Sequence, residues 1–371
     1  PFGEAKLKFT ATFAACSSLE EIPVGLFATN TKAKQFSETF ADCSALESIP
    51  EGLFANCPNI TQLDYIFGAT AIESIPSDIF SSASAATKLT GAFSACVCLR
   101  SIPYDLMANV TAATDIKYMF AGCSSITEIP SGVFRNNSAV TNLEYIFYKT
   151  GVSSLQAGIF EGLTGVKTIG AVFQDCQNLT TIEEGLFDGL TAAKSFRYCF
   201  ADCTALRSIP EGLLRGMTLA YEFTYMFHNT ALESVPAALF KDARDYSSAD
   251  FTYMFSECAN LKTVPAGLFD TFTKVTSPGY RNLFDNSGIE TIPAGLFAKS
   301  TVVSTGFESL FENCPKLHTI EGSIFGENSG VSSIGYMFCN CPELKNIPED
   351  LFAPFGEAKL KFTATFAACS S

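Results

Sequence analysis

Cysteine and histidine are the residue types in this chain whose side chains could do covalent or metal chemistry. The sequence has 14 cysteines but only two histidines, His228 and His318, which lie far apart. The C-x-C pairs Cys96–Cys98 and Cys339–Cys341 lack the second pair or the histidine that a structural zinc site needs. No serine–histidine–aspartate set and no glycine-rich phosphate loop can be assembled. The sequence therefore predicts that the chain is not an enzyme and holds no metal and no cofactor.

Ten of the cysteines recur at one position of a repeated unit, which we call the Cys column. They are Cys16, Cys43, Cys96, Cys123, Cys176, Cys203, Cys258, Cys314, Cys341 and Cys369. One inward position that returns in each unit is typical of buried thiols that pack as small apolar groups. Disulfides between adjacent units are the alternative, because a strand spacing of about 4.8 Å lies within the Cα range for a bridge. Parallel side chains fit a bridge poorly, and the cysteines do not identify a redox compartment.

Tyrosine supplies the one candidate for surface recognition. Seven of the 12 tyrosines stand two residues before a recurring phenylalanine, and they are Tyr65, Tyr118, Tyr145, Tyr198, Tyr225, Tyr253 and Tyr336. On a short helix whose i, i+3 and i+4 residues face inward, this position lies at the flank. The ring faces could stack on sugars or on a neighbouring filament. The alternative is a half-buried row of rings that seals the groove between units.

A periodic phenylalanine shows what must position these side chains. These ladder phenylalanines are Phe13, Phe40, Phe67, Phe93, Phe120, Phe147, Phe173, Phe200, Phe227, Phe255, Phe284, Phe311, Phe338 and Phe366. Successive members lie 26 to 29 residues apart. A fixed period in this range predicts a solenoid, in which each coil buries its apolar side chains against its neighbours.

The unit is clearest at Lys117–Phe134, KYMFAGCSSITEIPSGVF. Apolar residues at positions 116, 119, 120 and 123 follow the i, i+3, i+4, i+7 spacing of a short helix. The branched segment Ile126–Ile129, closed by Pro130, predicts a short strand. An alternative register places the strand at Tyr118–Phe120, because these two aromatic residues alternate with position 119.

The L-x-x-I-P-x-G-L-F pattern resembles the leucine-rich repeat, most closely at Ile182–Pro210, and the F-x-x-C-x-x-L-x-x-I-P block is similar to the BspA-like class of bacterial surface repeats. The chain departs from this class by its longer period and by phenylalanine in place of leucine. The resemblance implies an α/β solenoid with a right-handed coil. We expect short parallel strands on one face, short helical turns on the other, and about 13 coils of ~27 residues. It implies a binding or adhesive function without identifying the ligand.

Two deviations from the regular unit are visible. Thr70, Thr150 and Thr230 replace the cysteine in every third coil, where the connector is one residue shorter, and Ser287 does so out of step. These hydroxyls are expected to hydrogen-bond the loop backbone. Extra residues at 241–250 and 271–280 mark either binding loops or tolerated slack.

Residues 1–18 reappear without change at 354–371. The chain is therefore predicted to be a single continuous solenoid over residues 1–371, with no internal boundary. Either the parent protein carries tandem copies of a block of 353 residues, or the two ends simply match. Coils without a polar cap at the ends would expose core phenylalanine. The repeat favours a segment of a long fibre.

The net charge is −14 and the pI about 4.7, which disfavours nucleic acid as a partner. The sequence contains no run of 18 apolar residues, so it does not predict a segment that inserts into a membrane. We therefore expect a non-enzymatic structural or adhesive protein, extracellular or at the cell surface. Its expected partners are copies of itself, end to end or side by side, and possible further partners are a host protein or a glycan. The alternative is a monomeric surface receptor or adhesin that binds a protein or glycan on its concave face.

Overall fold

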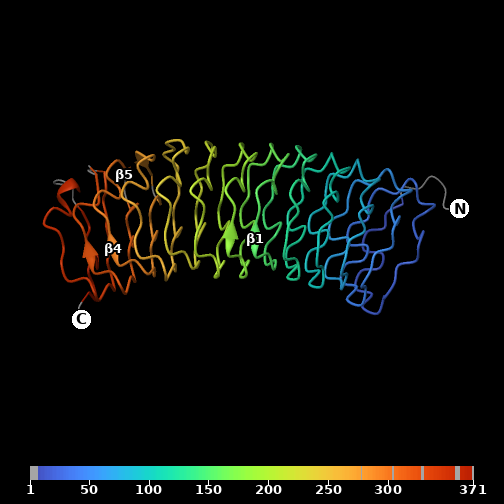
Figure 1. Cartoon of the computed structure of the whole chain (residues 1–371), viewed down its shortest axis with the longest axis horizontal. Helices are drawn as coiled ribbons and strands as arrows, with labels where there is room; N and C mark the ends of the chain where they lie inside the picture. The colour runs from blue at the N-terminus through green and yellow to red at the C-terminus, as the bar shows by residue number, and fades with distance from the viewer. Residues whose placement is uncertain (1–6, 277, 303–304, 327–329, 356–359, 370–371) are drawn as a thin grey trace. The chain divides into compact units, whose positions relative to one another are not determined.

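The computed structural model describes residues 7–276, 278–302, 305–326, 330–355 and 360–369. The chain divides into two compact units. One comprises Pro1–Leu179 with Gly185–Ala192, and the other Thr180–Glu184 with Ala193–Ser371. Within each unit the chain winds into successive coils that lie side by side (Figure 1). One continuous solenoid over residues 1–371, with no internal boundary, stays a prediction.

Regular secondary structure is short in the described residues. The strands are β1 Ser154–Leu155, β2 Thr181–Ile182, β3 Lys274–Val275, β4 Thr291–Ile292, β5 Thr301–Val302 and β6 Thr319–Ile320, and the 3₁₀ helix η1 is Ala353–Phe355. β3 pairs with β5 and β4 with β6, both in parallel. In each strand an apolar residue is buried and its neighbour faces outward. The predicted short parallel strands are therefore present, each with one buried side.

The predicted strand Ile126–Ile129 is not a regular strand in its own coil. At the equivalent place in another coil, β4 ends directly before Pro293. Ile126 and Ile129 are both buried although only two residues separate them. Because a strand alternates its side chains strictly, this segment cannot stay extended over its whole length. Only one or two residues of this segment can therefore pair as a strand with a neighbouring coil.

The predicted helical turn around Tyr118 is wrong. Tyr118 has a φ of 57°, whereas an α-helix needs negative φ throughout. The Met119 N–H donates to the Ile116 carbonyl at 3.3 Å, and the Cys123 N–H donates to the Phe120 carbonyl at 3.2 Å. These i to i+3 bonds, with positive φ at the third residue, define two successive turns of type II. The two turns place apolar residues on one side with the spacing that had predicted a helix.

The same pair of turns recurs along the chain and creates two columns of left-handed residues. The first turn column, two residues before each ladder phenylalanine, is Ala11, Glu38, Tyr65, Gly91, Tyr118, Tyr145, Ala171, Tyr198, Tyr225, Tyr253, Asn282, Ser309, Tyr336 and Ala364. The second turn column, two residues after it, is Ala15, Asp42, Ala69, Ala95, Gly122, Lys149, Asp175, Asp202, Asn229, Glu257, Asn286, Asn313, Asn340 and Ala368. Every non-glycine residue with positive φ in the described part of the chain belongs to one of these columns. Neither contains Val, Ile or Thr, since a branched Cβ is strongly disfavoured there.

Alternate N–H groups of one turn segment donate to the next coil. The Phe93 N–H donates to the Met119 carbonyl at 2.9 Å, and the Tyr118 N–H donates to the Glu144 carbonyl at 3.1 Å. The alternative register, Tyr118–Phe120, thus identified a segment that pairs between coils, although its backbone is turned. Each coil satisfies its turn backbone mainly through its neighbours, as buried backbone groups require.

The ladder phenylalanines form the centre of the core. Phe93 and Phe120 have ring centroids 5.8 Å apart and planes 6° apart, and Phe120 and Phe147 repeat this geometry at 5.8 Å and 4°. In the other unit Phe227 and Phe255 stack at 5.7 Å and 5°. These side chains are fully buried. The core is therefore a column of stacked rings, each contributed by a different coil.

The cysteines of the Cys column form no disulfide, and most of their thiols donate a hydrogen bond to the preceding coil. The Cys123 Sγ donates to the Phe93 carbonyl at 3.1 Å, and the Cys258 Sγ to the Phe227 carbonyl at 3.1 Å. All 14 cysteines are free in the structure. The thiols are mostly buried, as expected for small packed groups, but they also supply a specific bond that simple apolar packing would not.

Threonine replaces this bond within its own coil. The Thr70, Thr150 and Thr230 hydroxyls donate to the carbonyl three residues earlier at 2.8 to 2.9 Å, which confirms the predicted bond to the loop backbone. The two insertions bond to each other, since the Thr276 hydroxyl donates to the Ser247 carbonyl at 2.8 Å. This contact gives the extra residues a structural partner within their own unit.

Replacing Phe120 by Ala should lower the free energy of unfolding by about 3–5 kcal/mol, because the change removes a buried ring and leaves a cavity. Chemical denaturation of Phe120→Ala and the parent chain measures this difference. Val97→Ala is the control, since Val97 is 52% exposed, and should cost little. Equal losses in the two variants would contradict a core built on the ring column.

Burial raises the pKa of Cys176 from 9.0 to about 12, although its hydrogen bond with Thr150 opposes this shift. A thiol whose pKa is higher in the folded state stabilises the fold fully below roughly pH 9 and loses that contribution as the pH rises towards 12. Between pH 9 and pH 11, the parent chain should lose about 2 kcal/mol more stability than Cys176→Ser, which has no thiol to ionise. Denaturation at several alkaline pH values tests this, and parallel pH profiles would contradict it.

Candidate functional site

The seven predicted tyrosines all lie in the first turn column, so the turn backbone and not a helix positions them. Tyr118 and Tyr145 stack with ring centroids 4.8 Å apart and planes 5° apart. Tyr198, Tyr225 and Tyr253 form a second stack with spacings of 4.7 Å. The structure therefore brings five of the seven into two stacks, one in each unit.

The stacking limits what these rings can bind. Inside a stack, such as at Tyr225, both ring faces are covered by neighbouring tyrosines. A sugar could therefore stack on a ring face, as predicted from the sequence, only at the end of a stack, where one face is not covered by another tyrosine. Tyr65 and Tyr336 are 39% and 44% exposed, whereas the stacked tyrosines are half-buried. The stacks present ring edges and hydroxyl groups to a ligand.

The hydroxyls of Tyr118, Tyr225 and Tyr253 keep their protons over the physiological range, because their pKa values are raised. Burial raises the pKa of Tyr225 to about 12, and the adjacent Tyr253 and Tyr198 add to this shift. Burial likewise raises the pKa of Tyr118 and of Tyr253. Each stack therefore offers neutral hydroxyl groups that can both donate and accept hydrogen bonds.

Two cations lie against tyrosine rings, one in each unit. The Arg197 guanidinium is 5.1 Å from the centroid of Tyr198. The Lys149 Nζ is 5.2 Å from the centroid of Tyr148 and 3.2 Å from an Asp175 carboxylate oxygen. The interaction with Tyr148, followed by that with Asp175, raises the pKa of Lys149. Around Lys149 an aromatic ring, a carboxylate and an ammonium group are thus in contact.

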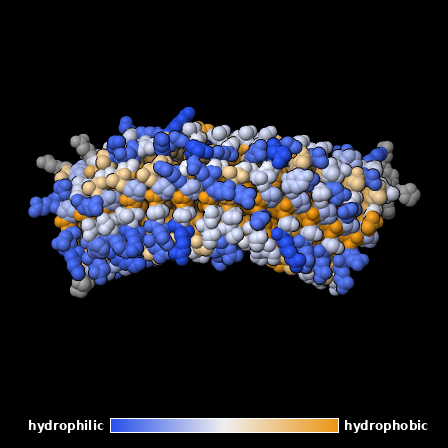
Figure 2. All heavy atoms as spheres, viewed as in Figure 1, coloured by the Kyte–Doolittle hydropathy of each residue, from blue (hydrophilic) through white to orange (hydrophobic). Residues whose placement is uncertain are grey.

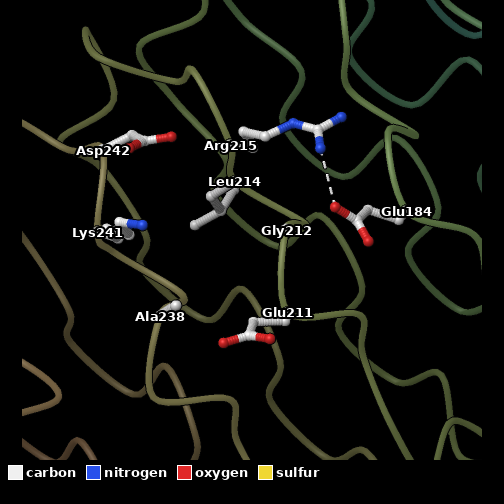
Figure 3. A pocket seen from close by; sticks show the side chains of 8 residues that line it. All are labelled: Glu184, Glu211, Gly212, Leu214, Arg215, Ala238, Lys241 and Asp242. Carbon is white, nitrogen blue, oxygen red and sulfur yellow. Dashed lines mark hydrogen bonds and ion pairs between the residues drawn. The ribbon is translucent and has the colours of Figure 1, made fainter.

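One hollow on the described surface lies between neighbouring coils, next to the bend at residues 210–212. Its volume is about 300 Å³, and it is lined by Glu184, Glu211, Gly212, Leu214, Arg215, Ala238, Lys241 and Asp242. Figure 3 shows charged groups of both signs around Leu214, with Arg215 pointing to Glu184, and this ion pair measures 2.9 Å. Leu214 stands where most coils have Phe. Mixed, exposed charges of this kind suit a solvated surface better than catalysis.

A second hollow, of about 280 Å³, adjoins the first turn column and is lined by Glu38, Ala41, Asp42, Tyr65, Gly68, Ala69, Ser94 and Ala95. We call it the Tyr65 hollow. The sequence analysis identified Tyr65 but missed Glu38 and Asp42. A signal for them was present in the sequence, because Glu38 stands two residues before the ladder phenylalanine Phe40 and Asp42 two residues after it. It was not recognised because those positions were assigned to a helix.

The two histidines lie in separate surroundings. The His228 Nδ1 is 2.7 Å from the Ser256 hydroxyl oxygen, and that hydroxyl donates to the Tyr253 carbonyl at 2.9 Å. The Ser256 hydroxyl has one proton, which it can donate to the Tyr253 carbonyl or to His228, so the direction of the His228–Ser256 bond depends on the histidine tautomer. His318 Nδ1 lies 2.8 Å from the Thr319 hydroxyl on the surface. Each histidine thus contacts a hydroxyl group in its own surroundings.

Within the described ranges, no group of three or more His, Cys, Asp or Glu side chains is arranged to hold a metal ion. The same residues contain no helix with the length and hydropathy that crossing a bilayer requires. Apolar residues gather in a band across the coils of each unit, with hydrophilic residues on either side (Figure 2).

Stacked short coils with parallel pairing and buried leucine, isoleucine and phenylalanine define a solenoid of the leucine-rich-repeat type. A family model for the BspA type leucine rich repeat region matches residues 11–139, 47–194, 127–247 and 251–351. The chain belongs to the BspA-type leucine-rich repeat family, which confirms the resemblance found in the sequence. No curated protein sequence matches it.

The solved structures that are similar to this chain include the following three. For TLR13 in complex with ssRNA13, the identity is 14%, the TM-score 0.41, and the coverage 90% of this chain and 43% of that one. A leucine-rich repeat protein from Bacteroides ovatus is 18% identical with a TM-score of 0.38, and the match covers 87% of this chain and 80% of that one. Toll from Drosophila, in complex with Spatzle, is 15% identical with a TM-score of 0.47, and the match covers 96% of this chain and 52% of that one. The chain thus spans about half the length of the TLR13 and Toll chains.

Replacing Tyr118 by Ala should lower the free energy of unfolding by about 0.5–1.5 kcal/mol, the usual value of an aromatic pair. The backbone accepts this change, because Ala11 and Ala171 occupy the same column with positive φ. Chemical denaturation beside Phe120→Ala, two residues away, gives the comparison. A loss equal to that of Phe120→Ala would show that the tyrosine is core and would remove it from the candidate site.

Proposed function

We propose that this chain is a non-enzymatic structural and adhesive protein of the extracellular or cell-surface space, and that it forms a segment of a long fibre. The family supports a repeat protein with a binding surface. The fibre rests on a separate observation, which is the behaviour of the sequence that occurs at both residues 1–18 and 354–371.

The two copies of this sequence use opposite edges of the same turn segment. In the first copy, the Phe9 N–H donates to the Gln35 carbonyl at 2.8 Å, and alternate N–H groups up to residue 15 continue this pattern. In the second copy, the carbonyls accept: the Tyr336 N–H donates to Thr363 at 2.9 Å. Carbonyls from residue 361 to residue 367 take part in this way.

This one sequence is therefore compatible with a neighbouring coil on either edge. Its ladder phenylalanine also stacks in both copies, at 5.4 Å between Phe13 and Phe40 and at 5.3 Å between Phe338 and Phe366. A segment that pairs on both edges allows a stack to continue through it without a change of register. Copies of the block, joined end to end, would then form a fibre.

The surface charge fits a secreted polymer. The chain carries a net charge of −14, which favours solubility and disfavours nucleic acid and anionic membranes as partners. Exposed ion pairs join adjacent coils, such as Arg207 with Glu233 at 2.7 Å. Such pairs contribute little to stability but favour the correct alignment of coils.

A second function is favoured by the tyrosines of the first turn column. Their stacked edges and hydroxyl groups, and the exposed rings of Tyr65 and Tyr336, could hold a host protein or a glycan. In this alternative the chain is a monomeric surface receptor or adhesin. Fixed, discrete particles would favour it over the fibre.

The fibre proposal is tested by extending the chain with residues 19–371 after Ser371, which creates two full blocks. Electron microscopy should show one continuous particle about twice as long as that of the parent chain. The melting temperature should not fall, because the junction repeats contacts already present in the single block. Two particles joined by a flexible break would overturn the proposal.

A further inference from the structure

The Tyr65 hollow owes its space to small side chains. Ala41, Gly68 and Ser94 stand one residue after their ladder phenylalanines, and Ala69 and Ala95 follow in the second turn column. Further along the same unit, the equivalent places are filled by long side chains such as Tyr148 and Lys149. At about 280 Å³ the hollow is suited to a single side chain and not to a large ligand.

An aromatic ring forms one wall of this hollow. Tyr65 is 39% exposed and has no stacked tyrosine on the next coil, where Gly91 stands in its place. A Cβ added to Gly91 would lie only 2.3 Å from the Tyr65 ring. The ring therefore rests against the Gly91 backbone, which fixes its position while part of it stays open to the hollow.

Two carboxylates lie beside the ring without a cation. Glu38 and Asp42 are exposed and line the hollow. Neither forms an ion pair among the residues that the structure describes. Their coil is held firmly against the next, because the Glu38 N–H donates to Asp64 at 2.7 Å and the Asp42 N–H to Gly68 at 2.8 Å. The hollow thus combines negative charge and an aromatic ring on a fixed backbone.

Elsewhere in the same unit, an aromatic ring and a carboxylate hold an ammonium group. Lys149 occupies the second turn column, and its ammonium contacts the Tyr148 ring and pairs with Asp175 at 3.2 Å. Asp175 belongs to the coil after Lys149, whereas Asp42 belongs to the coil before Ala69. Tyr148 follows its ladder phenylalanine by one residue, whereas Tyr65 precedes its own by two. The two places therefore share residue types but not the same arrangement.

We propose that the Tyr65 hollow binds a primary ammonium group, namely the side chain of a lysine on a partner protein. The ammonium group would lie between the Asp42 and Glu38 carboxylates, and the methylene chain would contact Tyr65 and the small residues of the floor. Charge attraction and cation–π attraction act together in this arrangement. A neutral sugar would leave both carboxylates without a cation, so the charges favour the amine.

Binding is measured by NMR titration of the full chain with Nα-acetyl-lysine methylamide. A single ammonium group should bind with a Kd on the order of 1 mM, and the affinity should fall at high salt. The analogue acetylated on Nε has no charge and should bind at least about tenfold more weakly. Equal binding of the two probes would overturn the proposal in favour of an uncharged ligand such as a glycan.

Three variants test the site, and each uses a residue type that the column already accepts. Ala69→Lys places an ammonium group of the chain's own at the edge of the hollow and should reduce binding about tenfold. Asp42→Asn and Tyr65→Ala should reduce it to a similar extent. Glu257→Gln, which changes a carboxylate of the second turn column in the other unit, is the matched control and should bind as the parent chain does. Unchanged binding in both Ala69→Lys and Asp42→Asn would overturn the proposal, whatever the outcome of the fibre experiment.

Discussion

Contact between one coil and the next is the constraint on which this structure depends. A coil of about 27 residues cannot bury its own aromatic side chains, and its turns leave alternate N–H groups without a partner in the same coil. The neighbouring coil satisfies both needs, with stacked rings such as Phe93 on Phe120 and with backbone bonds such as Phe93 to Met119. Buried thiols add a third link at the same place. Core packing and backbone pairing are thus two aspects of one interface.

The turns that create this interface also create the candidate sites. Most of these type II turns place a non-glycine residue at positive φ, which costs roughly 1 kcal/mol or more, and the bonds between coils must offset that cost. The residues at these places, among them Tyr65, Asp42 and Lys149, project their side chains from a backbone held on both sides. A rigid, repeated backbone therefore carries a row of variable positions. Recognition can change from coil to coil without any change in the fold.

The period, the ring core and the role of the threonines could be predicted from the sequence, because a fixed spacing reports directly on stacked coils. The helical turn was predicted wrongly, because two successive turns place residues 116, 119, 120 and 123 on one side just as a helix does. A better signal was present: the two turn columns contain Gly, Asn and Asp but no β-branched residue. The stacks of tyrosines follow from that geometry, and a helical flank would not have produced them.

The sequence by itself determined that the coils repeat, which side chains lie inside, and that the segment at residues 1–18 recurs at 354–371. Hydrophobic spacing and identity of sequence are properties of the chain alone. The tertiary structure decided which backbone shape meets that spacing, whether ring faces or ring edges reach the surface, and which carboxylates lack a cation. These features depend on the neighbouring coil, some 27 residues away, since only stacking brings Tyr225 onto Tyr198 or places Asp42 beside Ala69.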